Sequence, residues 1–160
     1  MAEAATATPA SGNGAATGSL TDPFRGYNFR LDVGGASLGH FTEVSGLGAR
    51  VQAISYREGG RGQVVRRIPG RVEYADVTLR YGVTSSQDLW NWFLTGLEGK
   101  VQRKHVSIFM LDADGSTDVV QWDLENAWPS EWRAAPLDAN GREVAVESMT
   151  LVFETLKRLK

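Results

Sequence analysis

The stretch that decides the fold spans residues 50–68 and reads RVQAISYREGGRGQVVRRI. Residues 50–57 have a strand pattern, the glycine-rich segment 58–62 is typical of a turn, and residues 63–68 can return antiparallel to the first strand. The pattern breaks at Pro69-Gly70, where we expect the second strand to end. The sequence therefore predicts a long hairpin, called the arm below.

Strand patterns continue on both sides of the arm, because apolar and polar side chains alternate there with a period of two. The predicted strands outside the arm are residues 24–33, 39–44, 74–81, 104–111, 120–128 and 143–155. Pro129 is expected to end the strand that precedes it. In the last strand the apolar positions change from even to odd numbers near Ser148, which predicts a β-bulge.

One helix is predicted over about residues 86–97. Ser85 and Asp88 have the spacing of an N-terminal capping pair, and the apolar residues that follow have helical spacing. At about 100° per residue, one arc of the helix contains Leu89, Trp90, Phe93, Leu94 and Leu97. Trp92 falls at the edge of this arc, so we expect it to be partly exposed in a single subunit and covered by a neighbouring subunit or the sheath. The alternative is that it packs against its own chain under a loop.

These elements predict a β-rich α+β domain in which two antiparallel sheets pack as a sandwich or barrel-like body, with one helix and the extended arm. Residues 1–22 precede it and read MAEAATATPASGNGAATGSLTD. They contain two acids, no base and no aromatic residue, so they supply too little apolar surface to offset the entropy of ordering. We expect residues 1–22 to be a flexible tail and residues 23–160 to form a single domain.

The charge balance and the hydropathy exclude two classes of partner. Seventeen Lys and Arg residues stand against 19 Asp and Glu residues, which gives a formal net charge of −2 and argues against a protein that coats nucleic acid. No apolar run approaches the roughly 18 residues that cross a bilayer, and the N-terminus lacks the basic-then-apolar pattern of a signal peptide. We expect synthesis in the cytoplasm, no membrane span and no nucleic-acid partner.

The residue types that catalysis and metal binding need are scarce. The chain has no cysteine, and His40 and His105 have no metal-binding spacing. Asp112-x-Asp114-Gly115 lacks the other ligands of a calcium loop and is more typical of a β-turn. No phosphate loop, nucleophile elbow or catalytic triad pattern is present. We expect no catalytic site, metal or cofactor, and a function other than that of an enzyme.

The five tryptophans allow two interpretations. They could form a sugar-binding platform, but Trp90, Trp122 and Trp128 fall on predicted apolar faces and are expected in the core. Trp92 and Trp132 stay open to a role at an interface.

Charge is distributed unevenly along the chain. Residues 57–71 hold five arginines and one acid, whereas residues 112–147 hold nine acids and two arginines. These could be two unrelated solvated surfaces. Alternatively, a basic arm on one copy could meet an acidic face on the next, which is a heterologous contact that propagates into rings or filaments.

An ordered set of short motifs runs through the chain. The set comprises Tyr27-x-Phe29, FTEVSGL at 41–47, YREGG at 56–60, IPG at 68–70, VTLR at 77–80 with Gly82, Leu89-Trp90-x-Trp92, AWP at 127–129 and EVAVE at 143–147. Over about residues 24–155 it resembles the phage-tail tube family, and more narrowly the inner tube protein of extracellular contractile injection systems. One departure is the Ala/Thr/Gly-rich tail, which is longer than the start of a typical tube protein.

The resemblance implies a structural subunit that forms hexameric rings, stacked head to tail into a rigid tube whose inner wall is a continuous β-barrel. Its implied partners are further copies of itself, the contractile sheath, baseplate, spike and tube-terminating proteins, and effector cargo in the lumen. Sheath contraction would drive the tube into a target. The particle would either stay in the cytoplasm or be released from the cell.

We expect the arm to be the principal assembly element. The expected interface residues are Val51, Ile54, Tyr56, Arg57, Glu58, Arg61, Val64, Arg66, Arg67, Ile68 and Trp92. Two alternatives stay open: a tube-initiating paralogue at the baseplate and, in a different class, a β-sandwich binding module that does not assemble.

Overall fold

The computed structural model describes residues 26–38, 41–57, 59–60 and 65–160. Within these residues the elements in chain order are β1 (Phe29–Val33), β2 (Ala36–Leu38), β3 (Phe41–Ser45), β4 (Ala49–Tyr56), β5 (Arg66–Tyr74), β6 (Val77–Gly82), α1 (Asp88–Leu97), β7 (Lys104–Leu111), β8 (Asp118–Arg133), β9 (Val146–Val152) and β10 (Thr155–Arg158).

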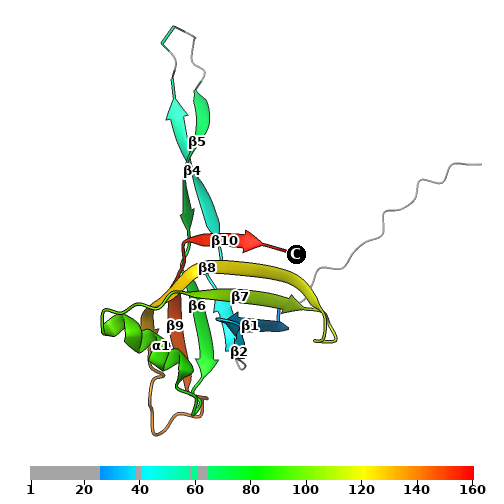
Figure 1. The fold of residues 1–160 in the computed structure, drawn as a ribbon, viewed down its shortest axis with the longest axis vertical. Coiled ribbons are helices and arrows are strands. Elements are labelled where there is room, and N and C mark those ends of the chain that lie inside the picture. Colours follow the sequence, from blue (N-terminus) through cyan, green and yellow to red (C-terminus); the bar gives the residue numbers. More distant parts are fainter. Residues whose placement is uncertain (1–25, 39–40, 58, 61–64) are drawn as a thin grey trace, which may run out of the picture.

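The body of the domain is built around the 16-residue strand β8. Antiparallel pairing gives the order β2-β1-β7-β8-β9-β6-β3, with β10 also paired to β8. The first part of β8, up to Ala127, pairs with β7, and the part from Trp128 onward pairs with β9. The neighbour of β8 thus changes along its length. As a result, the β1–β7 part of the sheet and the β6–β9 part pack on one another (Figure 1). The predicted α+β class with two packed antiparallel sheets is confirmed, as a sandwich-like body rather than a closed barrel.

The core lies between these two parts of the sheet. Its buried strand residues include Leu31, Val33, Val106, Ile108 and Leu124 from one part and Val77, Leu79, Met149 and Leu151 from the other. They recur at every second position, so each strand turns one face inward. Burial of each such side chain contributes roughly 1.5–3 kcal/mol.

Two prolines do not end strands as expected. Strand β5 passes through Pro69-Gly70 to Tyr74, and β8 passes through Pro129 to Arg133. Pro69 lies in a ribbon of two strands, where each strand has one unpaired edge and a missing N–H group is tolerated. At Pro129, β8 is paired with β9 on one side and has no described strand on its other side, and a register shift follows directly. A residue without an N–H group is therefore tolerated there.

The C-terminal strand also differs from the prediction. No register shift interrupts the pairing of β9 with β6 from Val146 to Leu151, so the bulge expected at Ser148 is wrong within these described residues. Val144 precedes β9 and is 80% exposed, which explains its position out of phase with the buried residues. Of the predicted segment 143–155, residues 146–152 form β9, and a separate strand, β10, begins at its last residue, Thr155.

The start of the helix is shifted as well. Helix α1 begins at Asp88, and it is Ser86 rather than Ser85 whose hydroxyl oxygen accepts a hydrogen bond from the Asp88 backbone N–H, at 3.5 Å. The Ser86 hydroxyl also donates to the Asp88 carboxylate at 2.9 Å. The helix itself is confirmed, two residues shorter than expected.

Candidate assembly surfaces

The arm consists of β4 and β5, which form a two-stranded sheet separate from the body. It extends from one end of the domain along the longest axis of the molecule (Figure 1). Every residue of β4 is exposed, as is most of β5. An arm of this kind makes its stabilising contacts almost entirely between its own two strands.

Apolar side chains along the arm remain in solvent. Val51, Ile54, Tyr56, Val65, Ile68 and Val72 are 37–55% exposed. Ile54 lies directly opposite Ile68, and Tyr56 lies opposite Arg66, so these four residues share one face of the ribbon. Sequence reasoning missed Val65 and Val72, and Val72 was missed because the strand was expected to end at Pro69. Exposed apolar residues concentrated in this way are typical of a surface that another molecule covers.

The base of the arm is fixed to the body. Gly46 has a φ of +84°, and a Cβ atom there would overlap the backbone oxygen of Asp76. The Ala75 N–H donates to the Gly48 carbonyl oxygen at 3.0 Å. The ring of Tyr74 packs on that of Phe153, with ring centres 5.5 Å apart. These contacts join the two ends of the arm and set its direction.

The predicted interface residues of the arm are placed as follows. Within the arm, Val51, Ile54, Tyr56, Arg57, Arg66, Arg67 and Ile68 are all exposed. Ile54, Tyr56, Arg66 and Ile68 share one face of the ribbon, whereas Arg67, opposite Ser55, lies on the other face. Glu58, Arg61 and Val64 lie outside the described residues. Arg50 pairs with Glu73 at 2.5 Å within the arm, so its charge is balanced locally.

The predicted exposure of Trp92 was wrong. Trp92 is 2% exposed, its Nε1–H donates to the Gln102 carbonyl oxygen at 2.7 Å, and the Lys104 ammonium lies 5.2 Å from its ring centre. Trp90, which was expected in the core, is 37% exposed and packs edge-on against Trp132 at 4.7 Å. The buried side of the helix is therefore rotated toward Trp92, which leaves Trp92 almost no surface to offer a neighbour.

Much of the acidic region is neutralised within the subunit. Asp118 pairs with Arg30 at 3.1 Å and Glu125 with Lys157 at 2.5 Å. Asp123 pairs with His105 at 3.2 Å. Burial acts to raise the pKa of Asp123, but hydrogen bonds from Gln121 and Ser107 and the charge of His105 outweigh it, so that pKa lies below its ordinary value. These carboxylates line the polar face of the β1–β7–β8 part of the sheet and are poor candidates for a partner of the arm.

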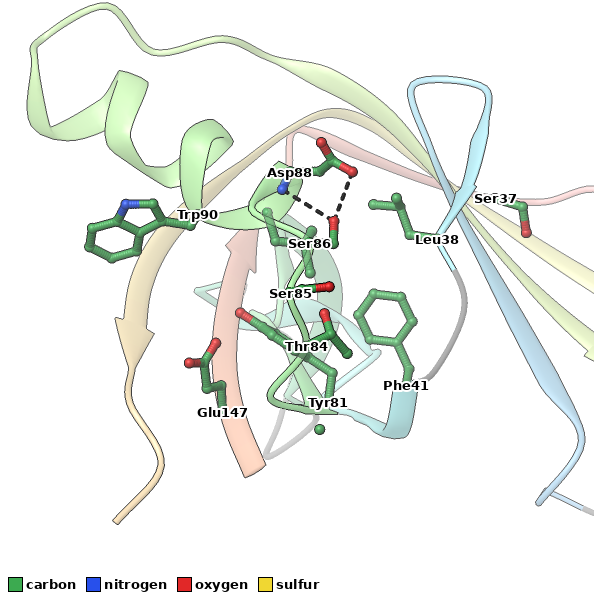
Figure 2. Close-up of a pocket in the computed structure, with 12 residues that line it drawn as sticks. Ser37, Leu38, Phe41, Tyr81, Thr84, Ser85, Ser86, Asp88, Trp90 and Glu147 are labelled. Carbon is green, nitrogen blue, oxygen red and sulfur yellow. Dashed lines mark hydrogen bonds between the residues drawn. The ribbon is translucent and has the colours of Figure 1, made fainter. Parts of the chain in front are cut away.

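A pocket of about 360 Å³ lies at the other end of the domain, between α1, the end of β6 and the start of β9. Its wall includes Phe41 and Tyr81, whose rings meet edge to face at 5.8 Å. The carboxylate of Glu147 lies beside the Tyr81 hydroxyl, and Asp88 and Ser86 lie at the helix start (Figure 2). Sequence reasoning missed this pocket because its residues come from five separate segments of the chain.

Burial, together with the negative charge of Glu147, raises the pKa of Tyr81 to about 12. Glu147 also accepts a hydrogen bond from Trp132 Nε1 at 3.4 Å. The phenol therefore stays protonated at neutral pH, and the charge on this side of the pocket is that of the carboxylate.

No helix in the described part of the chain is long and apolar enough to cross a membrane. Among the same residues, no group of three or more His, Asp or Glu side chains is arranged to hold a metal ion.

Solved structures of chains from extracellular contractile injection systems have the same fold. A chain of the PVC sheath–tube complex, an extracellular contractile injection system in the extended state, is 26% identical over 87% of this chain and 93% of that chain, with a TM-score of 0.79. A chain of the PVC sheath/tube terminator is 26% identical over 89% of this chain and 100% of that chain, with a TM-score of 0.81. Hcp1 from Flavobacterium johnsoniae shares the fold at 13% identity, over 83% and 95% of the two chains, with a TM-score of 0.53.

The comparison with curated protein sequences gives no match. The family model of the T4-like virus tail tube protein gp19, by contrast, matches residues 25–157, which is most of the chain and nearly the whole span of the motif resemblance. The resemblance inferred from the motifs is confirmed. This chain is a structural protein that belongs to the T4-like virus tail tube protein gp19 family.

Proposed function

We propose that this protein is the inner tube subunit of a contractile injection system. Its copies form hexameric rings that stack head to tail into a hollow tube inside a contractile sheath, and the tube is driven into a target. The subunit performs no chemistry itself. The proposal is supported by the family match and by the likeness, at 26% identity, to chains of a sheath–tube complex and of a sheath/tube terminator.

The observation that carries this proposal is the arm. Its six described apolar side chains are 37–55% exposed, and none of them belongs to the hydrophobic core of the body. Further burial of such a side chain contributes on the order of 1 kcal/mol. A monomeric protein gains nothing from holding this surface in water, whereas a polymer covers it at every subunit.

The open edges of the sheet support the same function. Strands β2 and β3 end the order of the described sheet, so each has one edge without a described strand beside it. Exposed edges are sites of pairing with other chains. Ring closure would pair edges of adjacent subunits and give the tube a continuous inner wall.

The apolar and the charged residues of the arm have different roles in association. Val51, Ile54, Tyr56 and Ile68, together with Val64, supply much of the energy of association. The arginines Arg57, Arg61, Arg66 and Arg67, with Glu58 among them, guide the choice and register of the partner, because interfacial charges contribute more to specificity than to affinity.

The remaining partners follow from the assembly. The outer surface of the tube meets the sheath protein, its two ends meet baseplate, spike and terminating proteins, and its lumen holds or passes effector cargo. These components define a phage-tail-like particle, which forms in the cytoplasm.

The test is the oligomeric state and its copy number. Sedimentation and electron microscopy of the full chain, alone and with sheath and baseplate partners, should give rings and tubes. Monomers at high concentration under both conditions would instead favour a β-sandwich binding module that does not assemble. Copy number along imaged particles separates a bulk tube subunit from a tube-initiating paralogue confined to the baseplate.

A further inference from the structure

We propose that the pocket between α1, β6 and β9 is the acceptor site for the arm of a second copy of this chain, and that it binds an arginine side chain from the outer end of that arm. The inference rests on the proposed function and deepens it, because it names the surface that the arm meets.

The pocket has the chemistry of a cation site. The Glu147 carboxylate lies on one side and the Asp88 carboxylate at the helix start, while Phe41 and Tyr81 provide aromatic rings (Figure 2). No Lys or Arg is present among its described lining residues. A guanidinium group satisfies such a site better than an ammonium group, because it can bind a carboxylate through two N–H groups and stack on a ring.

The pocket is partly closed rather than a flat acidic surface. Glu147 is half-buried and held by the Trp132 indole, while the Tyr81 phenol remains neutral beside it. The hydroxyl groups of Thr84 and Ser85 lie between these residues and Phe41, where they can accept further N–H donors (Figure 2). An arginine inserted here would exchange its water shell for fixed polar groups.

The arm carries suitable cations at its far end. Arg67 lies on β5 opposite Ser55, and Arg57 follows the end of β4 directly. Both are exposed, and within the described residues neither has an ion-pair partner. In contrast, Arg50 at the base of the arm is already paired with Glu73.

The two sites lie at opposite ends of the molecule. The arm projects from one end of the longest axis, whereas the end of β6, the start of α1 and the segment between β8 and β9 lie at the other (Figure 1). The segment between β8 and β9 also contains two acids, Asp138 and Glu143, and one base, Arg142, so its net charge is negative. A contact between opposite ends is heterologous and leaves one arm and one pocket free at the two ends of every stack, so it can continue without limit.

Glu147, in the pocket, is one of the acids of the predicted acidic region that has no ion-pair partner among the described residues. Asp118, Asp123 and Glu125 are paired within the subunit on the β1–β7–β8 part of the sheet. Charge complementarity therefore favours the pocket end over the larger acidic face as the partner of the arm.

Cross-linking tests the contact directly, because the natural chain contains no cysteine. Full-length Ser55→Cys and Thr84→Cys variants are mixed and treated with a short bismaleimide. A heterodimer should form in the mixture and not with either variant alone. The control pairs Ser55→Cys with Ser116→Cys, which places the thiol in the turn between β7 and β8. Equal yields from the test pair and the control pair would overturn the proposal.

Charge variants test the chemistry of the site. Glu147→Gln with Asp88→Asn should raise the concentration for half-maximal tube formation about tenfold or more, the change expected when a partly buried charge pair is broken. Glu98→Gln removes an exposed acid at the end of α1 and should have no such effect. Thr84→Arg, at an exposed position, fills the pocket from its own chain and should block stacking even if the first variant folds poorly.

A reversed pair distinguishes this contact from general electrostatics. Arg67→Glu and Glu147→Lys should each impair assembly, and the chain that carries both should assemble better than either single variant. If the wild-type chain forms tubes and the pocket variants form them equally well, the pocket proposal fails and the proposed function stands. If the wild-type chain stays monomeric with all its partners present, the proposed function is wrong, and this inference, which rests on it, is wrong as well.

Discussion

Gly46 lies so close to the backbone of Asp76 that a Cβ atom at position 46 would overlap the Asp76 carbonyl oxygen. Its φ of +84° is also in the left-handed region that glycine tolerates best. Gly46→Ala should therefore lower the free energy of unfolding by roughly 2 kcal/mol or more in urea denaturation. Gly26→Ala is the control, since open space surrounds that residue and the change should stay within about 0.5 kcal/mol. Equal stability of the two variants would show that this contact does not fix the base of the arm.

The rotated helix face predicts unequal effects for two neighbouring tryptophans. Trp92→Ala removes a buried ring and the hydrogen bond to Gln102, so it should cost about 3–5 kcal/mol of folding stability. Trp90→Ala leaves a cavity only where the ring meets Phe93 and Trp132, and should cost clearly less. Thermal and urea unfolding of the two variants measures the difference. A larger loss of folding stability for Trp90→Ala than for Trp92→Ala would instead support the buried helix face that the sequence predicted.

The pKa of Tyr81 gives a pH dependence with a defined sign. Burial first, and the charge of Glu147 second, raise it from 10.0 to about 12. An unfolded chain therefore loses this proton at lower pH than the folded one, so the contribution to stability is complete below pH 10 and is lost as the pH rises toward 12. Tyrosinate absorbance should show one late-titrating group that Tyr81→Phe removes. Glu147→Gln should shift that titration to lower pH, and an unchanged titration would contradict the assigned cause.

Charge reversal on the arm should impair assembly without unfolding the subunit. Arg66→Glu combined with Arg67→Glu should abolish or strongly reduce tube formation, while the thermal transition of the monomer stays close to that of the wild type, because exposed charge changes seldom cost much folding stability. Lys100→Glu, outside the arm, is the matched control. If the arm variant still forms tubes of normal length at normal salt, its charges do not direct assembly.

Removal of residues 1–22 should leave folding intact. This segment supplies almost no apolar surface, so its loss should change the free energy of unfolding by no more than about 0.5 kcal/mol. Circular dichroism and urea denaturation of the truncated chain measure this. A chain that unfolds on truncation would place the domain boundary upstream of residue 23.

The sequence was informative wherever one local pattern determines one element. Strict alternation predicted β7 over residues 104–111 with both ends correct, and the glycine-rich turn predicted the arm. Prediction failed where a tertiary neighbour decides the outcome. Pro69 is tolerated only because β5 belongs to a two-stranded ribbon, and Pro129 only because β8 has changed partners by that point.

Part of the candidate site could likewise be predicted from the sequence, and part could not. The exposed apolar and basic residues of the arm were predictable because they are contiguous in the sequence. The pocket was not, since Phe41, Tyr81, Asp88 and Glu147 meet only after β3, β6 and β9 pair. Trp92 was misplaced because helical periodicity gives the apolar arc but not the direction from which β8 and Lys104 approach it.

The isolation of β4 and β5 from the body also determines how growth begins. A lone two-stranded hairpin is only marginally stable in water, so the arms of free subunits offer one another poorly formed binding surfaces. At the end of an existing stack, by contrast, a complete set of acceptors is already in place. If the proposed tube forms, spontaneous nucleation should therefore be slower than elongation, and a solution of subunits should show a lag phase that a preformed template removes. In the proposed tube, the hairpin that joins the subunits would thereby delay assembly until a starting platform exists.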